Sequence, residues 1–171
     1  KWIQYYDEIP ARESAYHGVF TGVDLAISKK DTADYTAIVS ALFYDGGNGF
    51  FMYILPNPIN RRMNFPETIK QIKEVDGANK AVHSSYVLVE DVGYQRAVID
   101  QLTGDALNVT GVKVSGDKRS RLMSIATMIQ SGKIKFPKHG SEELVRQIVG
   151  FGAKRHDDLV DAFTILAHHA I

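Results

Sequence analysis

The stretch VFTGVDLAI, residues 19–27, decides the fold, because it combines the alternation of a β-strand with an acid inside an apolar run. Successive side chains of a strand point to opposite faces, so Asp24 lies on the face away from Val23 and Leu25. An ionised carboxylate in such a strand is unfavourable unless it is paired, hydrogen-bonded or bound to a metal ion. Asp24 is therefore either half of a buried ion pair or part of a functional site.

The length and composition of the chain indicate one globular α/β domain. Its 171 residues leave little room for a second core, and its 44% hydrophobic and 23% charged residues are ordinary for such a domain. Cysteine is absent, so a metal ion would have to be held by oxygen or imidazole ligands. No apolar run reaches the roughly 20 residues of a membrane span and no signal-peptide pattern opens the chain, so no membrane partner is expected.

Hydrophobic periodicity predicts a mixed sheet covered by helices. The predicted strands are 19–27, 35–44, 50–55, 85–90 and 109–114, with a short extended piece at 133–136. The predicted helices begin at Pro66 and after Glu90, cover 118–131 and 141–151, and begin again near Asp157. The first three strands form an antiparallel meander, and the apolar fourth strand is typical of a sheet centre covered on both faces. This order predicts an α/β fold, and residues 1–18, which lack sustained periodicity, are predicted to be an arm or linker.

Two more groups of acids stand where predicted elements end or begin. Glu90 closes the fourth strand, and the stretch RHDDLVDAF, residues 155–163, starts the last helix with Asp157, Asp158 and Asp161. One Asp suffices to cap a helix, and acids three or four residues apart repel unless a positive charge lies between them. By itself this stretch fits a solvated helix end as well as a metal site, and Glu90 by itself fits an ordinary strand end. If the first and fourth strands are neighbours, however, Asp24 and Glu90 converge where the last helix begins.

Such a cluster of carboxylates is suited to hard divalent cations. Mg²⁺ prefers oxygen ligands and keeps several waters, which leaves positions for a phosphate. Two such ions about 3.5–4 Å apart can stabilise the attacking and leaving oxygens of a phosphoryl displacement. This chemistry needs at least three acids, with one of them bridging both ions, and the chain offers enough of them.

The charge of the chain is zero overall but unevenly distributed. Residues 111–155 contain ten Lys or Arg side chains against three acids, so the rest of the chain is acidic by the same excess. A basic flank beside an acidic cluster is expected of an enzyme that acts on a polyanion with bound metal. The alternative is an ordinary solvated surface, since such surfaces are often lopsided in charge.

Five stretches, taken together and in this order, resemble one known family. They are GVDLAISKKDTADYTAIV (22–39), YVLVEDVGYQ (86–95), GDKRSRL (116–122), SGKIKF (131–136) and HDDLVDA (156–162). They are similar to the nuclease domain of the large terminase subunit of tailed bacteriophages, which belongs to the ribonuclease H-like, or retroviral-integrase-like, superfamily. The resemblance covers roughly residues 19–168. It implies a ribonuclease H-like fold, in which a three-strand antiparallel meander and parallel strands form one mixed sheet flanked by helices.

The resemblance also implies the roles of the acids. Asp24 would be the first catalytic acid and bridge two divalent ions, Mg²⁺ or Mn²⁺, with Glu90 as the second acid. Asp158 is our choice for the third, and Asp157 and Asp161 are further candidate metal ligands.

Secondary candidates surround these acids. Asp91 adjoins Glu90, but only one of the two can point into the site if the strand continues through both. His156 could also reach an ion, and Asp34 could assist from the loop after the first strand, where it fits a turn or cap equally well.

Three basic residues are assigned to DNA by the same resemblance. Lys118, Arg119 and Arg121 open a helix in a region that lies near the active site of the resembling proteins. We expect them to contact the DNA backbone or the scissile phosphate, although a helix start exposed to water is the simpler alternative.

The implied function is that of a metal-dependent endodeoxyribonuclease that cuts concatemeric double-stranded viral DNA during packaging. Residues 1–18 would end the linker from a preceding ATPase motor of the same polypeptide, and residues 19–171 would form the nuclease domain. The chain contains no GxxxxGK[ST] motif and so is not itself the motor. The resemblance further implies the portal protein and the small terminase subunit as partners, in the host cytoplasm at the procapsid.

Two other functions fit the same residues. A Holliday-junction resolvase or a transposase shares the arrangement of acids, and selectivity for branched DNA would separate a resolvase from a terminase nuclease. A non-catalytic DNA-binding or docking module of the same fold would keep the basic flank but bind metal weakly. A metal titration would distinguish this module from a nuclease.

Overall fold

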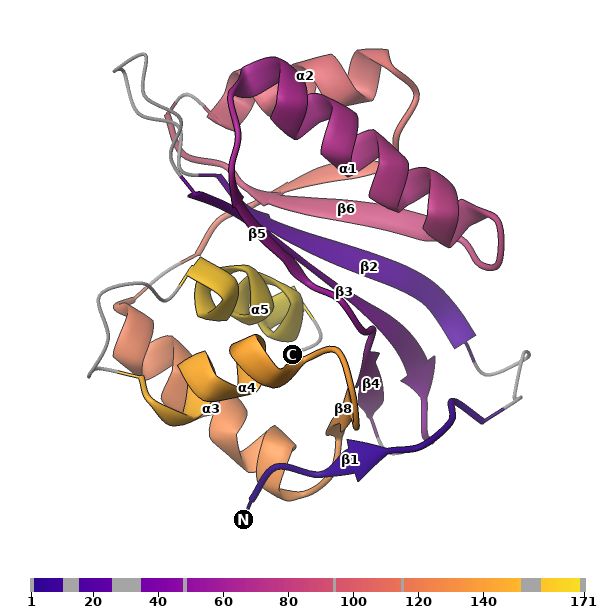
Figure 1. The fold of residues 1–171 in the computed structure, drawn as a ribbon, viewed down its shortest axis with the longest axis vertical. Coiled ribbons are helices and arrows are strands. Elements are labelled where there is room, and N and C mark those ends of the chain that lie inside the picture. Colours follow the sequence, from indigo (N-terminus) through magenta and orange to yellow (C-terminus); the bar gives the residue numbers. More distant parts are fainter. Residues whose placement is uncertain are drawn as a thin grey trace.

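A central mixed sheet with helices on both faces makes up the computed structural model (Figure 1). The structure describes residues 2–10, 16–25, 35–47, 49–93, 95–114, 116–151 and 158–169. The strands are β1 (Tyr5–Tyr6), β2 (Tyr16–Asp24), β3 (Tyr35–Asp45), β4 (Phe50–Ile54), β5 (Ile59–Arg62), β6 (Ser85–Glu90), β7 (Val109–Val112) and β8 (Ile134–Pro137). The helices are α1 (Phe65–Lys80), α2 (Gln95–Gly104), α3 (Lys118–Gln130), α4 (Glu142–Val149) and α5 (Asp158–His169). Among the described residues, none of the helices combines the length and apolar character that a membrane span needs.

The sheet has the strand order β1-β8-β4-β3-β2-β6-β7, and β5 pairs with β3 beside this path. The antiparallel pairs β2–β3 and β3–β4 form the predicted meander. The pairs β2–β6, β6–β7, β4–β8 and β1–β8 are parallel. The predicted α/β fold with a mixed central sheet is therefore confirmed, and the first and fourth predicted strands, β2 and β6, are neighbours.

Two strands were not predicted. The first, β5, pairs antiparallel with the beginning of β3 and lies between the predicted strand 50–55 and the helix predicted from Pro66. It follows Pro56 and Pro58 and reads INRR, so it offers neither an apolar run nor a long alternation. The second, β1, has two residues, and a strand of that length leaves no period to detect.

The N-terminal segment is part of the packed structure. β1 pairs in parallel with β8, and the hydroxyl of Tyr6 donates a hydrogen bond of 2.5 Å to the carbonyl oxygen of Ile54. The ring of Tyr6 lies edge-on against Tyr53, with 5.2 Å between ring centroids. β2 begins at Tyr16, three residues before its predicted start. The prediction that residues 1–18 lead from an ATPase motor stays a prediction.

The helices divide into two layers (Figure 1). α1 and α2 cover one face of the sheet, where Ile72, Val87 and Val98 are buried together. α3, α4 and α5 cover the other, where Phe136 and Phe163 are fully buried and 5.9 Å apart. α5 is the innermost helix of this layer, because all its residues from Leu159 to Ala167 except Asp161 are buried.

Gly22 allows α5 to approach the sheet closely. A Cβ added to this residue would overlap the carbonyl oxygen of Ala162 and lie 3.1 Å from Cγ of Leu166. The missing side chain thus lets the backbone of α5 rest directly on β2. As a result the first turn of α5 lies beside the carboxyl end of β2, where Asp24 stands.

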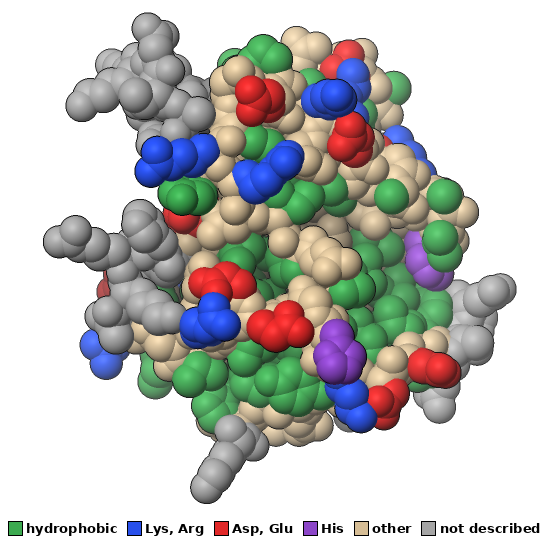
Figure 2. Space-filling view, viewed as in Figure 1, with side chains coloured by type: hydrophobic (Ala, Val, Ile, Leu, Met, Phe, Trp, Pro, Cys, Tyr) green, Lys and Arg blue, Asp and Glu red, His purple; other side chains and the backbone are tan. Residues whose placement is uncertain are grey.

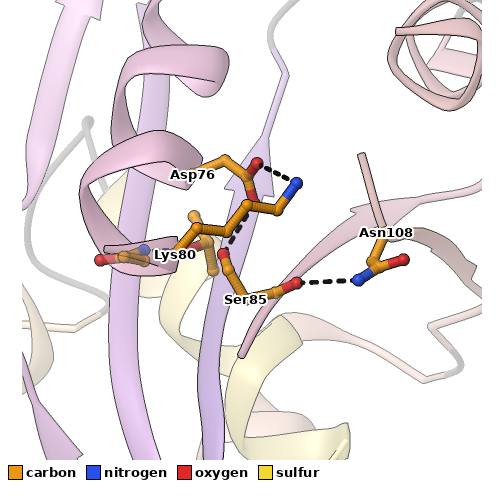
Figure 3. Close-up of polar contacts among 6 residues, drawn as sticks. Asp76, Lys80, Ser85 and Asn108 are labelled. Carbon is orange, nitrogen blue, oxygen red and sulfur yellow. Dashed lines mark hydrogen bonds and ion pairs between the residues drawn. The ribbon is translucent and has the colours of Figure 1, made fainter. Parts of the chain in front are cut away.

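A buried polar network fixes the opposite end of β6 (Figure 3). The carboxylate of Asp76 accepts a hydrogen bond of 2.7 Å from the hydroxyl of Ser85 and lies 3.1 Å from the ammonium of Lys80. Asn108 donates from its amide to the carbonyl oxygen of Ser85 at 3.4 Å. Because Asp76 is only 3% exposed, these partners compensate its desolvation and tie α1 to the start of β6.

The close approach at Gly22 predicts a specific packing defect. Gly22→Ala is expected to push α5 away from β2 and to lower the free energy of unfolding by about 1–3 kcal/mol, measured by urea denaturation. The matched control is Gly77→Ala, because a Cβ at this position in α1 meets nothing within 4 Å. That substitution is expected to stabilise the helix by roughly 0.5–1 kcal/mol. Equal changes in the free energy of unfolding for the two substitutions would show that a side chain at position 22 does not disturb the packing of α5 on β2.

Candidate metal centre

The pairing of β2 with β6 brings two acids to the same edge of the sheet. The strands are parallel, and Gly22 pairs with Leu88 and Val23 with Val89. Asp24 and Glu90 follow one residue later, so they stand side by side at the carboxyl ends of neighbouring strands. Both lie on the face that α5 covers, since side chains two residues apart share a face.

The first turn of α5 adds two acids to this edge. Asp24, Asp158 and Asp161 each offer a carboxylate oxygen, and these oxygens lie within 4.8 Å of one another. All three side chains are half-buried. Asp158 and Asp161 share one face of α5 because they are three residues apart. Carboxylates gathered this closely fit a hard divalent cation, which takes oxygen ligands.

The electrostatics of Asp24 show how crowded these charges are. Burial, followed by the negative charges of Asp161 and Asp158, raises the pKa of Asp24 to about 7. The ammonium of Lys118 acts in the opposite direction, and Glu90 adds a smaller upward contribution to the pKa. Among the described residues, negative charge therefore predominates around Asp24.

Lys118 supplies the positive charge within the cluster. Its Nζ lies 2.7 Å from Oδ2 of Asp161. Two hydrogen bonds of 2.7 Å fix the start of α3. The carboxylate of Asp117 accepts one from the backbone N–H of Ser120, and Nη1 of Arg121 donates the other to the carbonyl oxygen of Gly116. The rigid start of α3 thus holds the Lys118 ammonium at the acids.

This pairing was missed from the sequence, although a signal for it exists. A cation in the first turn of a helix is unfavourable beside the positive end of the helix dipole. Lys118 is the first residue of α3, and such a placement favours an acid from another element as its partner.

A comparison with known proteins identifies the family of the chain. The family model described as the terminase RNaseH-like domain matches residues 21–170. The chain belongs to this family. No curated protein sequence matches the chain significantly.

Solved structures of terminase nucleases share the fold. The large terminase nuclease of thermophilic phage G20c with bound zinc has a TM-score of 0.66 and 16% identity, over 99% of this chain and 94% of that one. The human cytomegalovirus terminase nuclease domain has a TM-score of 0.60 and 14% identity, over 97% of this chain and 88% of that one. The large terminase of a second thermophilic bacteriophage has a TM-score of 0.68 and 13% identity, over 96% of this chain but 42% of that one. The G20c nuclease has also been solved with bound magnesium and with bound cobalt.

Two further candidate acids of this terminase domain, Glu90 and Asp91, are not part of the group of three. Glu90 is beside Asp24 but is not one of the three acids whose oxygens lie within 4.8 Å. Asp91 turns toward α2 and β7, where its Oδ2 lies 3.4 Å from Nη1 of Arg96 and its Cβ lies next to Gly111. Of the two adjacent acids, only Glu90 therefore faces the site.

Other predicted residues are placed differently or fall outside the described part of the chain. Arg119 is exposed on α3, and Arg121 holds the Gly116 carbonyl as described above. Asp34, His156 and Asp157 lie outside the described residues.

The raised pKa of Asp24 predicts that the metal-free protein loses stability as the pH rises. The folded protein keeps this proton up to about pH 7, whereas the unfolded chain releases it near the ordinary value of 3.8. Between pH 3.8 and about pH 7, the folded state therefore binds more protons than the unfolded chain. The stability that this proton contributes is fully present below pH 3.8 and is lost as the pH rises through about 7. An upper limit for the loss is on the order of 4 kcal/mol.

Urea unfolding in EDTA, at points from about pH 5 to about pH 8, measures this loss. Asp24→Asn is expected to flatten the profile, because it removes the titrating group but keeps the side-chain volume. Parallel profiles for the wild type and the variant would contradict the assignment to Asp24.

Proposed function

We propose that this terminase domain is a metal-dependent endodeoxyribonuclease that hydrolyses phosphodiester bonds of double-stranded DNA. The observation that carries the proposal is the convergence of Asp24, Asp158 and Asp161 from two distant segments, with Glu90 beside them. The metal-bound phage neighbours support the choice of a metal centre.

The proposed cofactor is a pair of Mg²⁺ or Mn²⁺ ions. Asp24, whose side chain borders both the α5 acids and Glu90, is the proposed bridging ligand. Asp158, Asp161 and Glu90 complete the set, with Asp157 as a further candidate. Divalent ions held there would stabilise charge that develops on the phosphate and make a water more acidic. Hydrolysis then replaces the P–O3′ bond by a bond from phosphorus to the water oxygen, and the leaving oxygen ends as a 3′ hydroxyl.

The residues of α3 would hold the DNA strand. Lys118 is half exposed at 49%, so its ammonium can turn from Asp161 toward a phosphate when a cation neutralises the acids. Exposed Arg119 adds charge on the same helix, and Arg121 supports its first turn. Phosphate contacts carry no base information, so we propose that the isolated domain cuts with little sequence preference.

In its biological setting, the proposed substrate is concatemeric viral DNA during packaging. The large terminase of the second thermophilic bacteriophage extends well beyond the region that matches this chain. We accordingly place this domain after an ATPase motor in the same polypeptide, with residues 1–18 as the end of the linker. The portal protein and the small terminase subunit are the proposed further partners, in the host cytoplasm at the procapsid.

The main test is cleavage of supercoiled plasmid with Mn²⁺, Mg²⁺ or EDTA. The wild type is expected to nick and linearise the plasmid only with a divalent ion, and Asp24→Asn to lose at least about 100-fold in rate, because it removes the shared ligand. Asp91→Asn is the matched control: it removes a neighbouring acid that points toward α2 and is expected to keep the activity.

Calorimetry with Mn²⁺ separates the remaining outcomes if wild type and Asp24→Asn are equally inactive. Binding that the variant loses would show a competent centre that requires the motor, whereas no binding by either protein would contradict the nuclease function. A preference for branched over linear duplexes would favour a resolvase instead.

Lys118 gives a second test that does not depend on cleavage. Lys118→Gln is expected to raise the Mn²⁺ affinity roughly fivefold, because it removes a positive charge worth about 1 kcal/mol of repulsion at the ion, while it slows cleavage. The matched control is Lys73→Gln, since Lys73 is similarly exposed (45%) and pairs with Asp105 at 3.1 Å. Unchanged metal affinity in Lys118→Gln would show that its ammonium does not compete with the cation.

A further inference from the structure

Two residues of β5, Asn60 and Arg62, lie on the same face of the sheet as the metal centre. Asp24 pairs with Ala37 of β3, and Ala37 pairs in turn with Asn60 of β5. Directly paired residues share a face, so these three residues form a row that runs from the acid cluster onto β5. With strands about 4.8 Å apart, Asn60 is about 10 Å from Asp24 along this row.

Arg62 extends the same face by one more step. It lies two residues beyond Asn60 and pairs with Tyr35 at the beginning of β3. Its Cζ is 5.1 Å from the centre of the Tyr35 ring, and among the described residues it forms no ion pair. A guanidinium stacked on an aromatic ring keeps its N–H donors at the edge of the plane, where they can bind a phosphate.

The neighbouring Arg61 is used differently. It points to the opposite face of β5, where its Nη2 donates to Oε1 of Gln71 in α1 at 2.5 Å and lies 3.5 Å from the sulfur of Met63. The two adjacent arginines are both exposed, yet only Arg62 faces the side of the metal centre. In Figure 2, blue side chains lie over the segment where β5 leads into α1.

The row between the acids and Arg62 also contains an unsatisfied acceptor. Oδ1 of Asn60 is buried and has no hydrogen-bond partner within the described part of the chain. Such an atom is rare in a folded protein unless water or a ligand supplies the donor. Ala37, between Asn60 and Asp24, is fully buried in the core that includes α5, so of this row the exposed Arg62 is the side chain that a DNA strand could reach.

We propose that β5 forms a second wall of the DNA site and that Arg62 contacts a backbone phosphate a few nucleotides from the one at the acid cluster. The inference rests on the proposed function. The acids then lie between two cationic contacts, Lys118 on α3 and Arg62 on β5, which hold one DNA strand on both sides of the cleaved bond. Like Lys118, Arg62 would position the strand without reading bases.

The test is duplex DNA binding in EDTA, followed by fluorescence anisotropy from about 50 to about 200 mM salt. Arg62→Gln is expected to lower the affinity about fivefold and to reduce the slope of log affinity against log salt by about 0.9, the value of one phosphate contact. Arg61→Gln is the matched control and is expected to change neither. Arg62→Lys is expected to keep the slope, because it keeps the charge, and Mn²⁺ affinity is expected to be the same in all three variants.

The outcomes separate this inference from the proposed function. If the wild type binds and cuts DNA while Arg62→Gln equals it in affinity and slope, the role of Arg62 is wrong and the nuclease function stands. The role is also wrong if Arg61→Gln weakens binding as much as Arg62→Gln. If the wild type binds no DNA, the role of Arg62 is contradicted, and the nuclease function is contradicted as well only if the protein also cuts no DNA and binds no Mn²⁺. A reduced slope in Arg62→Gln alone, with normal Mn²⁺ affinity and thermal unfolding, supports the inference.

Discussion

The contact between α5 and β2 at Gly22 determines where the two acids of α5 lie relative to Asp24. Because no Cβ stands between the strand and the backbone of Ala162, the helix rests on the sheet and its first turn reaches the carboxyl end of β2. The apolar side chains of α5 then fill one core, while Asp158 and Asp161 emerge at its edge beside Asp24. The packing of α5 and the positions of its two acids thus depend on the same contact with Gly22. Asp24, Asp158 and Asp161 all belong to a strand or a helix.

The cost of this arrangement is electrostatic repulsion. Burial and the two acids of α5 raise the pKa of Asp24 to about 7, so the carboxylates of the folded protein repel one another when no cation is bound. Lys118 relieves part of this repulsion, and the positive end of the α5 dipole relieves a little more for Asp158. The acids therefore favour the binding of a cation that can replace the Lys118 ammonium at Asp161. In this way the packed core of the fold stabilises a cluster of acids that is suited to a metal ion.

The sequence predicted the elements whose signals are local and missed those that depend on pairing. Asp24 was identified because an ionised acid in an apolar strand is unfavourable without a partner, and the meander was predicted from three strands that follow one another closely in the sequence. β5 could not be predicted, because INRR becomes a strand only by pairing with β3. The partner of Lys118 was hidden for the same reason: α3 and α5 are separated by more than twenty residues of chain, and only packing brings them together. The direction of Asp91 likewise depends on Arg96 and Gly111 from other elements.

The charges around the site also bear on the number of ions. Among the described residues, the side chains of Asp24, Glu90, Asp158 and Asp161 face the ammonium of Lys118, and a bound cation would favour the ionised form of all four acids. With all four acids ionised, a single divalent ion would leave a net negative charge on these groups even while Lys118 stays on Asp161, and more of it once Lys118 turns to a phosphate. Two divalent ions would balance the four carboxylates by themselves and would leave Lys118 available to a phosphate. Among these described groups, charge balance therefore supports the proposed pair of ions together with the proposed role of Lys118 in DNA binding, and it predicts that metal binding and DNA binding are coupled.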